Sequence, residues 1–159
     1  VLLFMNLKFH SSVIFVKDIN ISKHFYCDLL NQEIEYDFGN NVLLKCGITL
    51  WQTPDWHYLH NNFYNAASGN KAFEICFETV QMDEALLLIK DNKVPLMHDI
   101  IEEKWGQRTI RILDPDNNLI EIGEKLEVFI RRLNDNGLSS LQIAQKTGVP
   151  EQQIKNIIS

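Results

Sequence analysis

The chain has 159 residues and a mass of 18.5 kDa, the size of one ordinary domain or of a domain with a small appendage. Hydrophobic residues make up 45% and charged residues 23%, a balance that excludes a disordered chain. Apolar runs such as residues 1–5 are too short for a membrane span or for the core of a signal peptide. We therefore expect a soluble, cytoplasmic protein that does not enter a membrane.

The net charge of −6 is unevenly distributed along the chain. Residues 1–124 carry 10 Lys and Arg against 18 Asp and Glu, a net charge of −8, whereas residues 125–159 carry 5 against 3, a net charge of +2. The change coincides with a change in sequence pattern, so we place a boundary near residues 123–124. An acidic body argues against nucleic acid as the ligand of residues 1–124.

Three cysteines stand in apolar stretches without CxxC spacing: Cys27, Cys46 and Cys76. An odd, scattered set of this kind predicts reduced, buried thiols in a reducing compartment. A thiol nucleophile would need a neighbouring base, and the sequence shows none beside them.

The first half of the chain predicts a strand, a helix and three further strands. Asp18, Asn20 and Ser22 are candidate helix caps, and apolar residues recur after them at helical spacing. Turn residues separate the short strands that follow. The expected elements are a strand over 8–16, a helix over about 20–30, strands over 33–38, 41–45 and 48–52, and a connecting loop over 53–70.

The second half repeats this order. It predicts a strand over 72–79 and a helix over 83–92 with Leu86, Leu87 and Ile89 near one face. A strand or irregular edge over 95–102 and strands over 107–113 and 119–124 follow. The expected fold is α+β, with two βαβββ modules at about 8–52 and 72–124 inside one domain over 1–124. We expect their curled mixed sheets to surround a shared cleft.

Residues 125–159 have a helical pattern throughout and form an expected C-terminal extension. A first helix ends before Gly137, a second begins at Ser139 with Gln142 completing a capping box, and a third begins with Pro150 at its first position. Residues 138–158 resemble a helix-turn-helix. The last helix would present Gln152, Gln153, Lys155 and Asn156, which are residue types that contact DNA bases.

Glu121 is the most informative candidate for a functional residue. It lies between Ile120 and Ile122 on the last predicted strand, and alternation sends the isoleucines to the helix side and Glu121 to the opposite face. A carboxylate on an otherwise apolar strand is costly unless it binds a cation, a proton or a polar ligand. A solvated edge carboxylate is the alternative.

The turn and strand over 114–121, with the pattern D-P-D-x-N-x-I-E, resemble the last hairpin of the vicinal oxygen chelate superfamily. That superfamily includes glyoxalase I, extradiol dioxygenases, fosfomycin-resistance transferases and bleomycin-resistance proteins. Residues 16–18 with Ser22, residues 25–26 and residues 29–30 resemble its first strand-to-helix junction. With the duplicated order, the resemblance covers about residues 8–124 and implies the two-module fold, although the fold alone does not define the reaction.

Metal-dependent members of the superfamily place ligands, usually His and Glu, on the inner faces of both modules. In this sequence the resemblance carries the first ligand onto Ser11, and His10 beside it has the opposite strand parity. The second falls within residues 48–51, where Thr49 and the nearby Gln52 are the polar groups. The remaining two positions hold Glu74 and Glu121.

Because two carboxylates remain without imidazole, a divalent metal on Glu74 and Glu121 is an open alternative, and the expected state has no metal. The same two residues are the catalytic candidates, since close carboxylates can share a proton.

The candidate ligand-binding residues lie mainly on the strand over 107–113. Arg111, Thr109 and Gln107 share a parity that places them on the face of Glu121, so Arg111 is either a structural partner of Glu121 or a clamp for an anionic or carbonyl group. Aromatic residues are candidates for apolar walls, although core packing is the usual role of such residues. The candidates are Trp51, Trp105, Trp56, Tyr58 and Phe9, and Ser11 completes the binding set.

Three functions follow as expectations. The first is a protein of the glyoxalase, bleomycin-resistance and dioxygenase type that binds a small molecule in the cleft between the two modules, with lyase or dioxygenase activity as an option. The second is a metal-free protein that sequesters a drug or metabolite, and the third is a ligand-sensing DNA-binding regulator. We expect a homodimer with a small-molecule ligand, and we expect residues 126–159 to stabilise the protein rather than to bind DNA.

Overall fold

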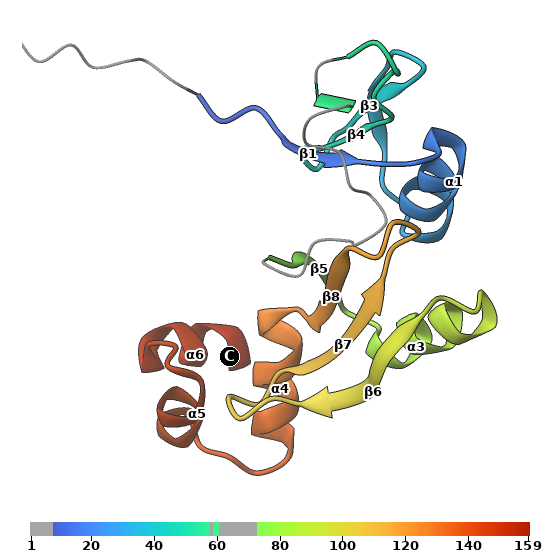
Figure 1. The fold of residues 1–159 in the computed structure, drawn as a ribbon. Coiled ribbons are helices and arrows are strands. Elements are labelled where there is room, and N and C mark those ends of the chain that lie inside the picture. Colours follow the sequence, from blue (N-terminus) through green and yellow to red (C-terminus); the bar gives the residue numbers. More distant parts are fainter. Residues whose placement is uncertain (1–7, 58, 61–72) are drawn as a thin grey trace, which may run out of the picture. The chain divides into compact units, whose positions relative to one another are not determined.

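The structure is a computed structural model that describes residues 8–57, 59–60 and 73–159. The chain divides into two compact units, one formed by residues 1–69 with 115–117 and one formed by residues 70–114 with 118–159. Each unit contains its own four-stranded mixed sheet with helices (Figure 1). The α+β class and the repeated βαβββ order are therefore confirmed.

The sheet of the first unit has the strand order β1-β4-β3-β2, with β1 parallel to β4 and the other pairs antiparallel. Its helical segment follows β1 and contacts β4. Buried apolar side chains such as Val42, Leu44 and Leu50 fill its core. The elements are β1 (Ser12–Phe15), α1 (Ile19–Lys23), η1 (His24–Leu29), β2 (Ile34–Asp37), β3 (Asn41–Leu44) and β4 (Ile48–Trp51).

The first strand is shorter than the sequence predicts. β1 begins at Ser12 rather than at residue 8, because its parallel partner β4 begins at Ile48, which pairs with Ser12. Residues 8–11 have no strand of the sheet opposite them, so β-propensity alone does not place them in the ladder. His10 therefore lies outside the alternation of β1.

The predicted helix over 20–30 begins one residue earlier and changes its pitch. The Asp18 carboxylate accepts hydrogen bonds from the N–H groups of Asn20 and Ile21 at 2.8 and 3.2 Å, which confirms Asp18 as the N-cap. From His24 to Leu29 the chain forms a π-helix, in which adjacent Phe25 and Tyr26 are both buried.

The second unit repeats the topology with the order β5-β8-β7-β6, in which β5 is parallel to β8. Buried isoleucines of β7 and β8 face the helix side, as the alternation predicts for Ile120 and Ile122. In the turn between β7 and β8, the Asn118 N–H donates to Asp114 Oδ1 at 2.7 Å. The elements are β5 (Ile75–Thr79), α3 (Met82–Asp91), β6 (Leu96–Glu102), β7 (Arg108–Leu113) and β8 (Leu119–Glu124).

The apolar face predicted for α3 is partly wrong. Leu87 is 61% exposed, whereas Met82 and Ile89 are buried, with Leu86 half-buried between them. The spacing of 82, 86 and 89 follows one helical face, and Leu87 lies about 100° away from Leu86 around the helix axis. α3 contacts β6 and β7 through this face.

The C-terminal extension belongs to the second unit and forms three helices: α4 (Leu126–Asp135), α5 (Ser140–Thr147) and α6 (Glu151–Ile158). The three helices contact one another (Figure 1). Their shared core consists of Phe129, Ile130, Leu133, Ile143 and Ile154. The capping box between Ser139 and Gln142 is confirmed. Pro150 stands at the N-cap of α6 rather than at its first helical position.

Glu124 connects this extension to the sheet. Its carboxylate is 1% exposed and accepts hydrogen bonds from the Arg108 N–H and Nε of β7, both at 2.9 Å. It also accepts from Arg132 of α4, at 3.3 Å from Nε and 2.8 Å from Nη2. The same Nη2 donates to the carbonyl of Gly106 at 2.6 Å, so one buried acid joins two strands, a turn and a helix.

The expectation of buried thiols is wrong for two of the three cysteines. Cys46 and Cys76 are exposed and Cys27 is half-buried, all three as free thiols. Cys46 lies in the turn between β3 and β4, and Cys76 lies on the sheet face opposite the buried isoleucines, so neither position belongs to a core. No helix within the described ranges is long and apolar enough to cross a membrane.

Candidate functional site

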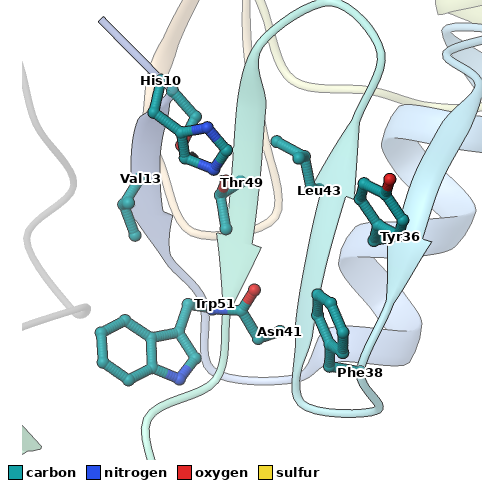
Figure 2. A pocket seen from close by; sticks show the side chains of 9 residues that line it. His10, Val13, Tyr36, Phe38, Asn41, Leu43, Thr49 and Trp51 are labelled. Atoms are coloured by element: carbon teal, nitrogen blue, oxygen red, sulfur yellow. Dashed lines mark hydrogen bonds between the residues drawn. The ribbon is translucent and has the colours of Figure 1, made fainter. Parts of the chain in front are cut away.

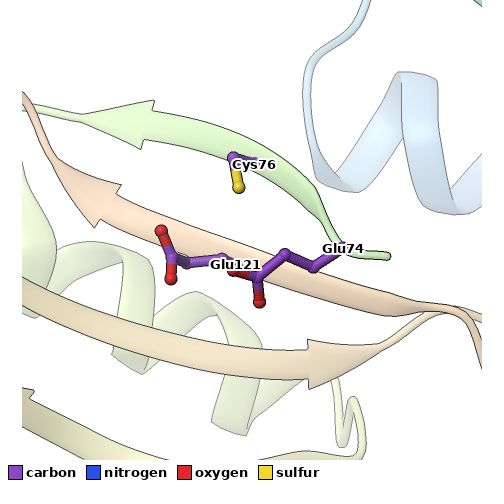
Figure 3. Close-up of side chains that lie close together, drawn as sticks. All are labelled: Glu74, Cys76 and Glu121. Carbon is purple, nitrogen blue, oxygen red and sulfur yellow. The ribbon is translucent and has the colours of Figure 1, made fainter. Parts of the chain in front are cut away.

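Glu74, Cys76 and Glu121 lie together on one face of the second sheet (Figure 3). In the ladder, Glu121 of β8 pairs with Cys76 of β5 on one side and with Arg111 of β7 on the other. Glu74 stands one residue before β5 and has the parity of Cys76. The predicted face of Glu121 is therefore the observed one.

Arg111 lies at the centre of these acids. Its Nε donates to Glu74 Oε2 at 2.8 Å and its Nη1 donates to Glu103 Oε1 at 3.2 Å. Its Nη2 donates to Glu121 Oε2 and makes a longer contact of 3.4 Å with Glu74 Oε1. Three carboxylates thus share one guanidinium, which favours the structural pairing of Arg111 over an anion clamp.

The pKa values of the cluster are shifted by burial and by these neighbours. Burial raises the pKa of Glu121, Arg111 lowers it, and the charges of Glu74 and Glu103 raise it, with a net upward shift. The hydrogen bond from Arg111 to Glu74 raises the pKa of Arg111. Burial, followed by the charges of Glu121 and Glu74, raises the pKa of the Cys76 thiol, which makes it a weak nucleophile at neutral pH.

The three other predicted residues of this unit have structural contacts. Thr109 Oγ1 donates to Glu103 Oε1 at 3.2 Å. Gln107 Nε2 donates to the Glu124 carbonyl at 2.9 Å, and Gln107 Oε1 accepts from Trp105 Nε1 at 3.1 Å. Trp105 is 43% exposed and is not among the residues that line the pocket of the first unit described next.

The first unit has a pocket of about 440 Å³ on one face of its own sheet (Figure 2). Ser11 and Trp51, both predicted as binding residues, line it. Side chains of alternate residues on the four strands form the walls, because period-two alternation sends them to one face. The lining residues are His10, Ser11, Val13, Tyr36, Phe38, Asn41, Leu43, Thr49 and Trp51.

Aromatic rings and hydroxyl groups both line this pocket. Tyr36 and Phe38 stack with ring centroids 6.0 Å apart and an interplanar angle of 18°. Trp51 contacts His57 edge to face, with ring centroids 4.9 Å apart. Thr49 Oγ1 donates to Ser11 Oγ at 2.8 Å. The pocket therefore combines apolar planar surfaces with a few small polar groups, a composition typical of small-molecule sites.

These residues do not fit the transition-metal site that the family resemblance implies. In the first unit, the two expected ligand positions hold the neutral hydroxyls of Ser11 and Thr49, which bond each other. In the second unit, the lone pairs of Glu74 and Glu121 accept hydrogen bonds from Arg111. Tight first-row metal sites use imidazole, thiolate or free carboxylate donors.

Several residues at these two faces were not predicted. Cys76 could have been found from the sequence, because it shares the parity of Glu74 on β5. His10, which has the opposite strand parity to Ser11, also lines the pocket, because it precedes β1 and is not bound by the alternation of that strand. Glu103 follows β6, whose pairing with β7 has two register shifts, so its position could not be obtained by counting residues.

Among the other aromatic candidates, Phe9 and Trp56 are each 81% exposed, and Tyr58 lies outside the described residues. Trp56 contacts His57 with ring centroids 5.7 Å apart, and His57 is the same residue that contacts Trp51.

The residues that would contact DNA bases lie exposed on α6. Gln152, Gln153, Lys155 and Asn156 are all exposed, but Lys155 pairs with Glu151 at 2.9 Å. Arg132 points to Glu124 and Glu102 rather than to solvent. The cations of the extension are therefore partly neutralised by its own acids and by the sheet.

Known proteins resemble most of this chain. The family model described as "Glyoxalase-like domain" matches residues 9–127, so most of the C-terminal extension lies outside the match. The bleomycin resistance protein of Geobacillus stearothermophilus is 27% identical over 125 residues, which cover 70% of this chain and 92% of that protein. A solved structure of a protein of unknown function from Agrobacterium tumefaciens str. C58 is 34% identical, with a TM-score of 0.67, and covers 77% of this chain and 98% of that one. The fosfomycin resistance protein of Listeria monocytogenes shares the fold at 21% identity and a TM-score of 0.57, over 79% of this chain and 98% of that one.

Proposed function

The chain belongs to the glyoxalase-like family, and we propose that it binds a small molecule with a planar, apolar part in the aromatic pocket of its first unit, without a transition metal. The observation that carries this proposal is the pocket of about 440 Å³ lined by Tyr36, Phe38 and Trp51. Its volume lies within the range typical of pockets for small ligands, roughly 300–1,000 Å³.

The walls support a planar ligand. Trp51 and the stacked pair of Tyr36 and Phe38 offer ring faces and edges, against which an aromatic group packs favourably. Tyr36 and Phe38 are 55% and 73% exposed, so a ligand would remove apolar surface from water. Burial of that surface supplies the main driving force for binding.

The polar groups support an acceptor on the ligand. Ser11 Oγ accepts from Thr49, and a serine hydroxyl that accepts one hydrogen bond still has a proton to donate. Asn41 and His10 add further donors at the same face. We therefore expect a planar aromatic or heteroaromatic compound that carries a carbonyl, hydroxyl or ring nitrogen.

Bleomycin is the first compound to test, because the curated relatives are named bleomycin resistance proteins. A molecule larger than the pocket would place its planar part there and leave the rest in solvent. Binding without turnover would then sequester the compound.

The test is a fluorescence titration with bleomycin and, separately, with the planar dye 8-anilinonaphthalene-1-sulfonate. We expect the wild-type tryptophan emission to change on binding, the change to be lost in Trp51→Phe, and the affinity to fall in Tyr36→Ala. Trp105→Phe is the matched control and should retain the change. A response that persists in Trp51→Phe and disappears in Trp105→Phe contradicts the proposal, as does the absence of any response to both compounds.

A second candidate is an acid–base enzyme that uses Glu121 as proton carrier. The specific observation is the raised pKa of Glu121, which lies beside Glu74 and Arg111 on the sheet face opposite the buried isoleucines. A carboxyl that holds its proton to higher pH is a better general acid near neutrality. This candidate predicts turnover that Glu121→Gln abolishes while the binding measured at Trp51 persists.

A further inference from the structure

The carboxylates of the second unit already have a cation. Arg111 bonds Glu74, Glu103 and Glu121, and the four side chains are 14–30% exposed. The three acids contribute −3 and Arg111 +1, so the cluster keeps a net charge of −2. At this partial burial the attraction between the groups is less screened than at an open surface.

The acids are nevertheless close enough for one metal ion. One ligand atom from each of Glu74, Cys76 and Glu121 can be chosen so that all lie within 4.8 Å of one another. Ligand atoms on one cation stand about 2.0–2.6 Å from it, so separations of this size are compatible with shared coordination. The separations between these ligand atoms therefore do not explain why the cluster does not fit a metal site.

We infer that Arg111 is the built-in cation of this site and that its guanidinium keeps divalent metals out. A metal would have to displace a guanidinium that bonds three carboxylates, or bind with a positive charge beside it. Both cost free energy, since removing one partner of a partly buried ion network leaves the others unpaired and like charges repel.

This inference is independent of the aromatic pocket, because it concerns residues of the second unit alone. Its failure through metal on the wild-type protein would contradict the metal-free state proposed above but would leave ligand binding in the aromatic pocket untouched. The failure of ligand binding would leave Arg111 as the cation of this site.

The test compares metal binding by wild type and Arg111→Met, which keeps the aliphatic stem and removes the charge. Zn²⁺ and Mn²⁺ are titrated by calorimetry, and bound metal is counted by elemental analysis after dialysis. We expect Arg111→Met to bind one ion per chain, on the order of tenfold or more tighter than wild type. The double variant Arg111→Met/Glu121→Gln should lose this gain. Arg131→Met, which removes the same charge from an exposed position of α4, should behave as wild type.

Two results would overturn the inference. One is stoichiometric metal on wild type that Glu121→Gln removes. The other is a folded Arg111→Met, verified by circular dichroism, that binds no more metal than wild type. Should Arg111→Met not fold, the wild-type melting temperature in excess Zn²⁺ gives the answer. We expect no rise, and a rise that Glu121→Gln abolishes shows that Arg111 does not exclude the metal.

Discussion

Replacing Glu124 with Ala tests how the C-terminal extension is attached to the sheet. The carboxylate is 1% exposed and accepts four hydrogen bonds from Arg108 and Arg132. Removing one partner of a buried ion pair costs about 3–5 kcal/mol. The two arginine side chains are 26% and 23% exposed, so water can rehydrate them in the variant. We therefore expect the free energy of unfolding to fall by about 3 kcal/mol, near the lower end of that range.

The assay is urea unfolding in a background in which Trp51 and Trp56 are replaced by Phe. Trp105, the remaining tryptophan of the three, then reports on the turn beside Gly106, where Arg132 binds. The control is Glu127→Ala, whose exposed pair with Lys125 at 3.8 Å predicts a loss below about 1 kcal/mol. Equal losses in both variants would refute the anchoring role of Glu124.

The pH dependence gives the same test an independent readout. Burial alone would raise the pKa of Glu124, but the hydrogen bonds from Arg132 and Arg108 outweigh it, and the pKa lies below the usual value. A lowered pKa stabilises the fold above the ordinary pKa of Glu, and this stabilisation is lost as the pH falls through the lowered value. The difference between wild type and Glu124→Ala should therefore shrink in acid.

Three further predictions concern other parts of the chain. The pKa of Glu121 is raised in the folded protein, so ionisation of this carboxyl destabilises the fold as the pH rises through the raised pKa. Gln cannot ionise, so the free energy of unfolding of Glu121→Gln, measured in urea, should increase relative to that of wild type from acid to neutral pH. Ser22 Oγ is buried without a hydrogen-bond partner among the described residues, so thermal unfolding should show Ser22→Ala neutral or up to about 1 kcal/mol more stable. Removal of residues 126–159 deletes the apolar core that the three helices share and leaves Glu124 without Arg132, so the melting temperature should fall, while a mobility-shift assay at low salt should detect no DNA binding before or after truncation.

Local rules predicted much of the fold. The strand over 119–124 has the predicted bounds, because alternating isoleucines and a polar turn define both its ends. The capping box at Ser139 is a local hydrogen-bond pattern and is equally visible in the sequence. The repeated βαβββ order predicted two mixed sheets of the same composition, and each unit contains one.

The features that the sequence did not predict depend on strand pairing partners and on long side chains. The start of β1 depends on where β4 begins, which a propensity at residues 8–11 does not contain. Arg111 was placed on the correct face, but its bond to Glu103 depends on irregular pairing between β6 and β7. The inward turn of Arg132 depends on the buried position of Glu124. Such contacts arise from tertiary packing rather than from local pattern.

The most direct test of ligand binding in the aromatic pocket is a nuclear magnetic resonance titration of the tryptophan indole N–H signals with bleomycin. The chain has three tryptophans, and each contributes one indole N–H signal. We predict that the Trp51 signal moves progressively and saturates, because its ring lines the pocket, while the Trp105 signal stays in place. A Trp105 signal that moves while that of Trp51 remains unchanged would contradict the account.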